Sequence, residues 1–96
     1  MFEELDPLLH QQLRLAVISL LMNVREAEFT YIKEKTGATA GNLSVQISKL
    51  KDAGYIEVQK SFKENYPQTM CRISAAGTTA FENYVKALEK YINISK

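Results

Sequence analysis

The chain has 96 residues, of which 46% are hydrophobic and 24% charged, and its formal net charge is +1. This length fits one compact domain, and the composition is that of an ordinary soluble globular protein. No apolar run approaches the ~20 residues that a membrane-spanning helix needs. The chain opens with Phe2-Glu3-Glu4 rather than a basic stretch, so we expect no secretory signal and a cytoplasmic protein.

One cysteine and one histidine leave little for metal or covalent chemistry. Cys71 has no partner for an internal disulfide, and we expect it to be a small core residue rather than a nucleophile. His10 is expected at the surface, near the start of the first helix. The sequence has no metal-ligand cluster, phosphate-binding glycine loop or convincing carboxylate pair. We therefore expect no cofactor, no metal and no enzymatic activity.

The first predicted helix begins at Asp6-Pro7, where a carboxylate can cap the helix and a proline is tolerated in its first turn. Its core-facing stripe follows helical spacing and comprises Leu13, Ala16, Val17, Leu20, Leu21 and Val24. A second apolar stripe on another face comprises Leu8, Leu15, Ile18 and Met22. This second stripe needs cover, which either the C-terminal helix or a second subunit would supply.

Residues 23–28 are polar and predict a loop that leads into a short strand near residues 27–29. A brief helix over residues 29–35 follows, and Gly37 ends it in a left-handed cap. Thr39 has the side chain of a good N-cap, so a further helix is predicted to begin there.

That further helix has one apolar seam, because Leu43, Ile47 and Leu50 are spaced four and three residues apart. Gly54 is predicted to end it. A helix that only faced solvent would carry more Glu and Lys than this one does. The residues off the seam are predicted to face solvent, and they are Ala40, Gly41, Asn42, Ser44, Val45, Gln46, Ser48 and Lys49.

Two alternating segments, at residues 55–60 and 69–73, predict a β-hairpin. Residues 61–67 between them form a polar loop that is longer than a tight turn needs. A hairpin that follows two helices joined by a short turn is a wing. Its side chains predicted to face inward are Ile56, Val58, Cys71 and Ile73.

Ser74 is predicted to cap a last helix, which runs from Ala75 to about Ile92. Its apolar stripe comprises Phe81, Tyr84, Val85, Leu88 and Tyr91. Apolar stripes on the first and last helices indicate that these two helices pack together. They also predict a homodimer interface built from one or both of them. We expect residues 1–96 to form a single domain.

The predicted order is helix, strand, helix, helix, strand, wing, strand, helix. This is a mainly helical α+β fold with a small antiparallel sheet, and its middle helices form a helix-turn-helix. Such a fold places the second of these helices, about residues 39–52, in the major groove of double-stranded DNA. The wing, about residues 60–68, would then lie on the flanking backbone or the minor groove. Sequence-specific DNA binding is the predicted function.

The candidate DNA-binding residues follow from their chemistry. Asn42 and Gln46 carry the amides that pair with adenine, and Val45 can meet a thymine methyl group. Hydroxyls and lysines suit phosphates, to which the helix N-terminus adds its own affinity for anions. The wing lysines can equally protect an edge strand from aggregation. The complete predicted set is Thr39, Ala40, Gly41, Asn42, Ser44, Val45, Gln46, Lys49, Lys60 and Lys63.

The net charge is uneven along the chain. Residues 1–29 carry −3, residues 30–63 carry +3 and residues 64–96 carry +1. The positive excess therefore coincides with the predicted DNA-contacting segment, where phosphates would require it. Arg72 lies opposite Glu57 in the predicted hairpin, and we expect the two to pair with each other.

Four motifs carry a family resemblance: Leu5-Asp6-Pro7-Leu8-Leu9-His10 with Leu13-Arg14-Leu15, Gly41-Asn42-Leu43-Ser44, Leu50-Lys51-Asp52-Ala53-Gly54-Tyr55 and Ile73-Ser74-Ala75-Ala76-Gly77. Over essentially its whole length, the chain resembles the small single-domain winged-helix transcriptional regulators of archaea and bacteria, relatives of the MarR and ArsR groups. The resemblance implies a dimeric DNA-binding regulator. It does not extend to the cysteine and histidine ligands of ArsR-type metal sensors, which this chain lacks.

Two functions fit these observations. The first is a homodimeric transcriptional regulator that binds a pseudo-palindromic operator. The alternative is a winged-helix module for protein–protein interaction without specific DNA binding. The low net charge and the apolar surplus of the first helix favour this alternative.

Overall fold

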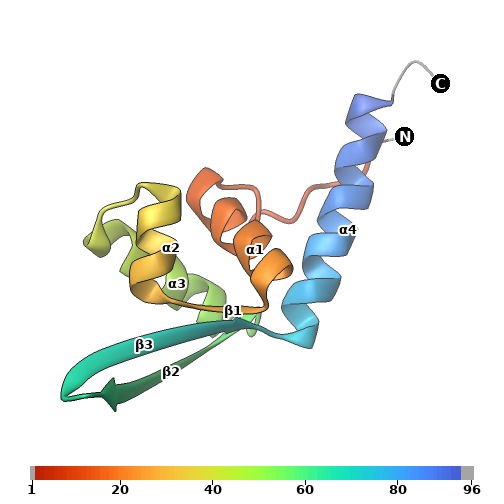
Figure 1. Ribbon diagram of the computed structural model, residues 1–96. Coiled ribbons are helices and arrows are strands. Elements are labelled where there is room, and N and C mark those ends of the chain that lie inside the picture. The colour runs from red at the N-terminus through yellow and green to blue at the C-terminus, as the bar shows by residue number, and fades with distance from the viewer. Residues whose placement is uncertain (1, 94–96) are drawn as a thin grey trace.

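The computed structural model describes residues 2–93 and contains the predicted order of helices and strands (Figure 1). Three helices pack together on one side of a small sheet, a long hairpin extends past them, and the last helix projects from the opposite end. This is the winged-helix α+β fold that the sequence predicts. Its elements are α1 (Gln12–Val24), β1 (Glu26–Glu28), α2 (Phe29–Thr36), α3 (Ala40–Asp52), β2 (Ile56–Lys63), β3 (Tyr66–Ile73) and α4 (Ala75–Ile92).

The sheet is antiparallel, with the strand order β1-β3-β2. Strands β2 and β3 pair from Ile56 opposite Ile73 to Lys63 opposite Tyr66. The short strand β1 pairs with the other side of β3, at residues 70–72. The central strand is therefore bonded on both sides near the helices and on one side along the wing.

The core lies between α1, α2, α3 and the inner face of the sheet. The predicted seam of α3 is confirmed, since Leu43, Ile47 and Leu50 are buried. Cys71 is a core residue as predicted, and burial raises the pKa of its thiol to about 11. The fully buried side chains are Leu9, Val17, Ile18, Leu21, Ile32, Leu43, Leu50 and Cys71.

Helix α1 begins later than the sequence predicts. The Asp6 carboxylate accepts a hydrogen bond from the backbone N–H of Leu8 at 2.9 Å and so stabilises a separate turn. The helix starts only after Gln11, whose side chain accepts from the N–H of Arg14 at 2.7 Å. Because the Asp6 turn satisfies its own backbone, the chain can change direction before the helix. At its other end, α1 continues through Asn23, into the segment predicted to be a loop.

The second apolar stripe of α1 is covered within the chain. Ile18 is fully buried, and Leu8, Leu15 and Met22 are half-buried against the core. The domain's own packing therefore covers this stripe, and α1 contacts α2 and α3 as well as the C-terminal helix that was predicted to cover it. Apolar surface remains exposed elsewhere, on α4 and at the start of the chain.

The hairpin is tighter than predicted. Strand pairing continues to Lys63 and Tyr66, which leaves Glu64 and Asn65 in the turn with φ of 52° and 68°. Two successive residues in the left-handed region are typical of a type I′ turn, whose twist matches that of the paired strands. The prediction of a polar loop over residues 61–67 is therefore wrong, and the wing is a regular two-stranded ribbon.

Arg72 has a different ion-pair partner from the predicted one. It lies opposite Glu57 in the sheet register, as expected, but its guanidinium pairs with Glu26 of β1 at 3.0 Å. The central strand has a neighbour on each side, and the prediction considered only the neighbour within the hairpin.

The N-terminal segment, residues 2–11, starts beside the far end of α4 and crosses from there to α1 (Figure 1). Phe2 stacks on Tyr91 with ring centroids 4.6 Å apart, and Glu3 pairs with Lys90 at 2.9 Å. The hydroxyl of Tyr91 also donates to the carbonyl of Glu3 at 2.9 Å. These contacts tie the start of the chain to the far end of the last helix.

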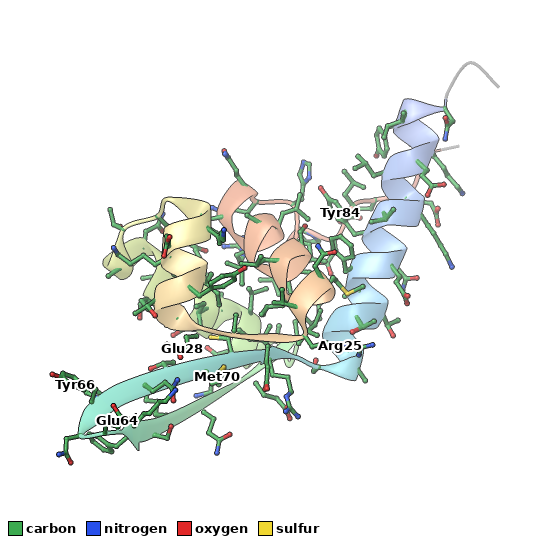
Figure 2. The ribbon with its side chains drawn as sticks, in the orientation of Figure 1. Arg25, Glu28, Glu64, Tyr66, Met70 and Tyr84 are labelled. Atoms are coloured by element: carbon green, nitrogen blue, oxygen red, sulfur yellow. The ribbon has the colours of Figure 1, made fainter. Side chains whose placement is uncertain are left out.

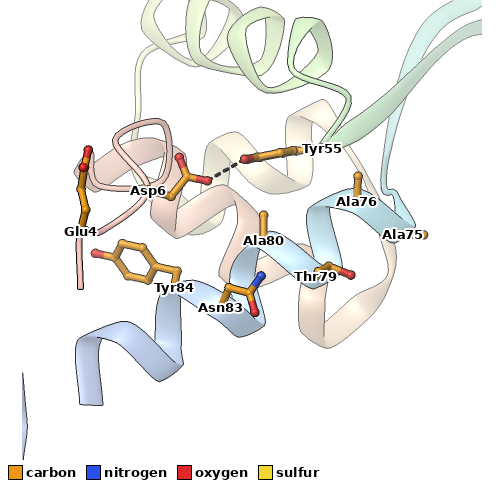
Figure 3. Close-up of a pocket in the computed structure, with 9 residues that line it drawn as sticks. All are labelled: Glu4, Asp6, Tyr55, Ala75, Ala76, Thr79, Ala80, Asn83 and Tyr84. Atoms are coloured by element: carbon orange, nitrogen blue, oxygen red, sulfur yellow. Dashed lines mark hydrogen bonds between the residues drawn. The ribbon is translucent and has the colours of Figure 1, made fainter. Parts of the chain in front are cut away.

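A pocket of about 590 Å³ lies between this segment and the first half of α4 (Figure 3). At its edge the Tyr55 hydroxyl donates to the Asp6 carboxylate at 2.6 Å. This hydrogen bond stabilises the protonated phenol and is the main cause that raises the pKa of Tyr55 to about 12. The bond joins the segment that follows α3 to the N-terminal segment.

Helix α4 begins against the peptide that follows α3. Ser74 caps it, accepting from the N–H of Gly77 at 3.0 Å, as predicted for the cap. The N–H of Ser74 in turn donates to the carbonyl of Tyr55 at 3.0 Å. A Cβ on Gly77 would lie 2.1 Å from that same carbonyl oxygen, so a glycine is required for this close approach.

Replacement of Gly77 by alanine is expected to lower the free energy of unfolding by about 1–3 kcal/mol, because the added methyl forces α4 away from Tyr55. Urea unfolding followed by circular dichroism measures the loss. Gly41→Ala is the matched control, since it also adds a methyl to a helical glycine and nothing lies within 4 Å of the new atom. Equal stability of the two variants would contradict the close approach.

Tyr55→Phe is expected to lower stability by about 1 kcal/mol near neutral pH, because it removes the hydrogen bond to Asp6. The folded-state pKa of about 12 lies above the ordinary 10.0. The hydrogen bond therefore contributes fully below about pH 10 and is lost as the pH rises toward 12. Urea titrations of both proteins near pH 8 and near pH 11 should show a smaller alkaline loss for the variant. An identical loss would contradict the bond.

Candidate nucleic-acid interface

The outer face of α3 carries most of the predicted DNA-binding side chains. Thr39 caps the helix as predicted, with its hydroxyl accepting from the N–H of Asn42 at 3.2 Å. Val45 is 51% exposed, so an apolar side chain stands among the polar ones on this face. The predicted residues that are exposed on this helix are Thr39, Ala40, Gly41, Asn42, Ser44, Val45 and Lys49.

A notch of about 270 Å³ separates α3 from the hairpin. Ser44, Ser48 and Lys51 line it from the helix, while Lys60 and Thr69 line it from the strands. Phe29, Ile47 and Val58 complete the lining, so the hollow is partly apolar. Its hydroxyls and its two lysines are the groups that suit the oxygens of a phosphate. The structure thus brings Ser44 and Lys60 of the predicted set to the same place.

Lys51 is a notch residue that the sequence prediction missed. It lies about two helical turns after Ser44, so helical spacing places the two on the same side of α3. Helical spacing alone could therefore have identified Lys51 as a notch residue. The predicted outer face ended at Lys49, because Lys51 stands close to the predicted end of the helix.

The wing carries exposed aromatic side chains as well as lysines. Lys63 is exposed next to the turn and does not line the notch. Figure 2 shows Glu64 and Tyr66 at the tip of the hairpin, away from the helices. Phe62 is 79% exposed and Tyr66 74% exposed. Phe62 lies two residues after Lys60 and therefore shares its face of the strand.

Gln46 does not face solvent, so that part of the prediction is wrong. Its side chain is only 8% exposed. It lies three residues after Leu43 and four before Leu50, which places it on the flank of the buried seam. That spacing was visible in the sequence, but a glutamine is buried only where polar partners satisfy it.

The partners of Gln46 are Arg14 and Asn42. The guanidinium of Arg14 donates to Gln46 Oε1 at 2.5 Å, and Gln46 Nε2 donates to Asn42 Oδ1 at 2.9 Å. Arg14 Nε also donates to the carbonyl of Leu8 at 2.6 Å. A continuous row of hydrogen bonds therefore connects the N-terminal segment, α1 and the exposed start of α3. We call Arg14, Gln46 and Asn42 the amide relay.

Other parts of the surface are less suited to nucleic acid. Glu4 and Asp6 make the pocket beside α4 acidic, which disfavours phosphate. Residues 2–93 contain no group of three or more side chains arranged to hold a metal ion. No helix among these residues has the length and hydrophobicity to cross a bilayer.

Comparison with known proteins identifies the family. Residues 13–92 match the family model of the winged helix DNA-binding domain. The chain belongs to that family. Its fold and family are those of DNA-binding transcriptional regulators rather than enzymes.

A relative from the archaeon Methanocaldococcus jannaschii is 36% identical to this winged-helix protein over 72 residues, which cover 75% of this chain and 78% of the relative. That relative is an uncharacterized protein. Among solved structures, a transcriptional regulator homologue from Pyrococcus horikoshii superposes with a TM-score of 0.84 at 26% identity, covering 90% of this chain and 85% of its own.

NadR, solved in complex with 4-hydroxyphenylacetate, has the same fold with a TM-score of 0.73 at 17% identity. The match covers 92% of this chain and 65% of NadR. The resemblance to small winged-helix transcriptional regulators that the sequence motifs indicated is thus confirmed.

Proposed function

We propose that this winged-helix protein is a homodimeric, sequence-specific transcriptional regulator that binds double-stranded DNA in the cytoplasm. The observation that carries the proposal is the outer face of α3, where small and polar side chains lie exposed beside a notch lined by two lysines. Family membership supports DNA binding, and side-chain chemistry supports the contacts proposed below.

In this proposal α3 enters the major groove with its N-terminal half against the base edges. Ala40 and Gly41 let the helix backbone approach closely, because alanine carries only a methyl group and glycine has no side chain. Asn42 and Val45 face the bases, and the apolar Val45 suits a thymine methyl group. The unpaired N–H groups of the first turn attract a phosphate near Thr39.

The DNA backbone follows the notch and the wing. Lys51 and Lys60 approach one phosphate from opposite walls of the notch, where Ser44 can also donate to it. Lys49 contacts an adjoining phosphate. Farther out, Lys63 follows the flanking backbone or the minor groove.

Two copies of the chain join through α4 and the N-terminal segment. Phe2 and Tyr91 stack on each other, yet they keep 50% and 41% of their surfaces exposed. Val85 is 36% exposed and Ile92 68% exposed on the same helix. A second copy across a two-fold axis covers these side chains on both subunits at once, and it turns the two α3 helices toward an inverted repeat.

Selection of bound fragments from genomic DNA tests the function as a whole. The expected result is an inverted repeat whose half-sites lie about one helical turn, ~34 Å, apart. Binding that is independent of sequence would overturn operator recognition. Absence of binding at low salt would overturn DNA recognition itself and leave a protein-interaction module as the function to test.

Lys51→Ala and Lys60→Ala should each weaken binding to all DNA sequences by a similar factor and reduce the slope of log affinity against log salt by about 1. Fluorescence anisotropy with a labelled duplex across a salt series measures the slope. Lys86→Ala on α4 is the matched control, since Lys86 is exposed away from the notch and should leave the slope unchanged. An equal decrease for all three variants would remove the notch as a phosphate site.

The double variant Val85→Asp, Ile92→Asp should shift the protein from dimer to monomer in sedimentation velocity, because both side chains are exposed in the single chain and lie on the proposed interface. Val24→Asp is the control, since Val24 is also exposed, at 40%, but lies at the end of α1. A wild-type protein that stays monomeric at high concentration would overturn the dimer.

A further inference from the structure

The amide relay has a fixed direction that follows from the chemistry of its members. Arginine can only donate hydrogen bonds, so the group of Gln46 that faces Arg14 must be its carbonyl oxygen. The amide nitrogen of Gln46 then faces Asn42. Because that nitrogen can only donate, the group of Asn42 that meets it must be the Asn42 oxygen. The cation at one end therefore orients both amides.

Because Gln46 is buried, the reversed orientation of its amide is strongly disfavoured. With 8% of its surface exposed, Gln46 has little access to water that could replace a lost partner. A reversed Gln46 amide would aim its N–H groups at the guanidinium, where no acceptor faces them. It would also leave Arg14 without its second acceptor beside the Leu8 carbonyl. Unsatisfied buried groups of this kind destabilise the fold, because they lose their water partners without replacement.

At the exposed end of the relay, the Asn42 amide is consequently held in one orientation. The Oδ1 atom of Asn42 is directed at Gln46, and its backbone N–H is directed at Thr39. The Asn42 amide nitrogen, with its two N–H donors, is the group left for a ligand. The Asn42 oxygen keeps a second lone pair, but it is held toward Gln46, whereas a freely rotating asparagine could turn either its oxygen or its nitrogen toward a base.

We propose that the amide relay turns the two N–H donors of Asn42 toward the major groove, where they favour guanine. Guanine presents two acceptors there, N7 and O6, while the bidentate adenine contact needs the oxygen and the nitrogen of the amide to face the base together. The inference rests on the proposed function, since it specifies one base contact of the same α3 helix. It replaces the adenine contact that the sequence alone predicted for Asn42. Arg14 and Gln46 act as positioning residues that touch no DNA.

Gln46→Glu tests the direction of the relay without altering Asn42. A carboxylate at this position still accepts from Arg14 but has no N–H to donate. Asn42 must then reverse, donate to the introduced carboxylate and expose its own oxygen. We expect the base preference at one position of each half-site to change from guanine to cytosine or adenine, which carry an amino donor.

The experiment is sequence selection from a random duplex library with wild type, Gln46→Glu, Asn42→Asp and Asn42→Ala. Asn42→Ala identifies the affected position, where it should remove a preference of roughly 10-fold or more. Asn42→Asp should give the same change as Gln46→Glu, because its carboxylate accepts from Gln46 and exposes a second oxygen. It therefore replaces Gln46→Glu if that variant does not fold. Preferences are compared within each variant, since both acidic changes lower total affinity for DNA.

The outcomes separate this inference from the function on which it rests. If wild type selects no sequence, the proposed function fails first. If wild type selects a motif but prefers adenine at the base position that Asn42→Ala affects, the relay does not determine which group of Asn42 faces the base. The same conclusion follows if Asn42→Ala removes no base preference, or if guanine is retained in both acidic variants.

Discussion

Burial of one face of α3 determines which residues of that helix remain available. Leu43, Ile47 and Leu50 insert into the core against α1 and the sheet, and they bury the helix along a single seam. The hydrophobic effect drives this packing without regard to the outer face, so the outer residues are free to serve recognition. The rotation of α3 about its own axis follows from the seam. Each exposed side chain then has a defined direction before any ligand arrives.

Much of this arrangement could be predicted because its signals are local. Thr39 and Ser74 cap helices by bonding to an N–H three residues later, and Gly37 ends α2 with a φ of 71°. A seam with helical spacing predicts α3 equally well. The exposed positions from Thr39 to Lys49 were identified correctly, with the exception of Gln46. That these positions contact DNA stays a prediction.

The parts that could not be predicted depend on distant partners. Gln46 is buried because Arg14, 32 residues earlier in the chain, satisfies its oxygen. Asp6 suggested a helix start, but its carboxylate accepts from Leu8 and from a tyrosine 49 residues later. The loop predicted between the strands failed for another reason. A strand with few apolar residues resembles a polar loop in sequence, and only the Glu64-Asn65 turn reveals the pairing.

The contact between Gly77 and Tyr55 makes the start of α4 the point about which this helix would tilt. It fixes the helix at that end, directly beside the segment that leaves α3. The 18 residues of α4 extend for ~27 Å at 1.5 Å per residue, so a tilt of about 10° at this pivot moves the far end by ~5 Å. In a dimer joined through α4, that shift corresponds to roughly one and a half base-pair steps of 3.4 Å between the half-sites. A glycine remote from the DNA would thus set the operator spacing to which the dimer fits.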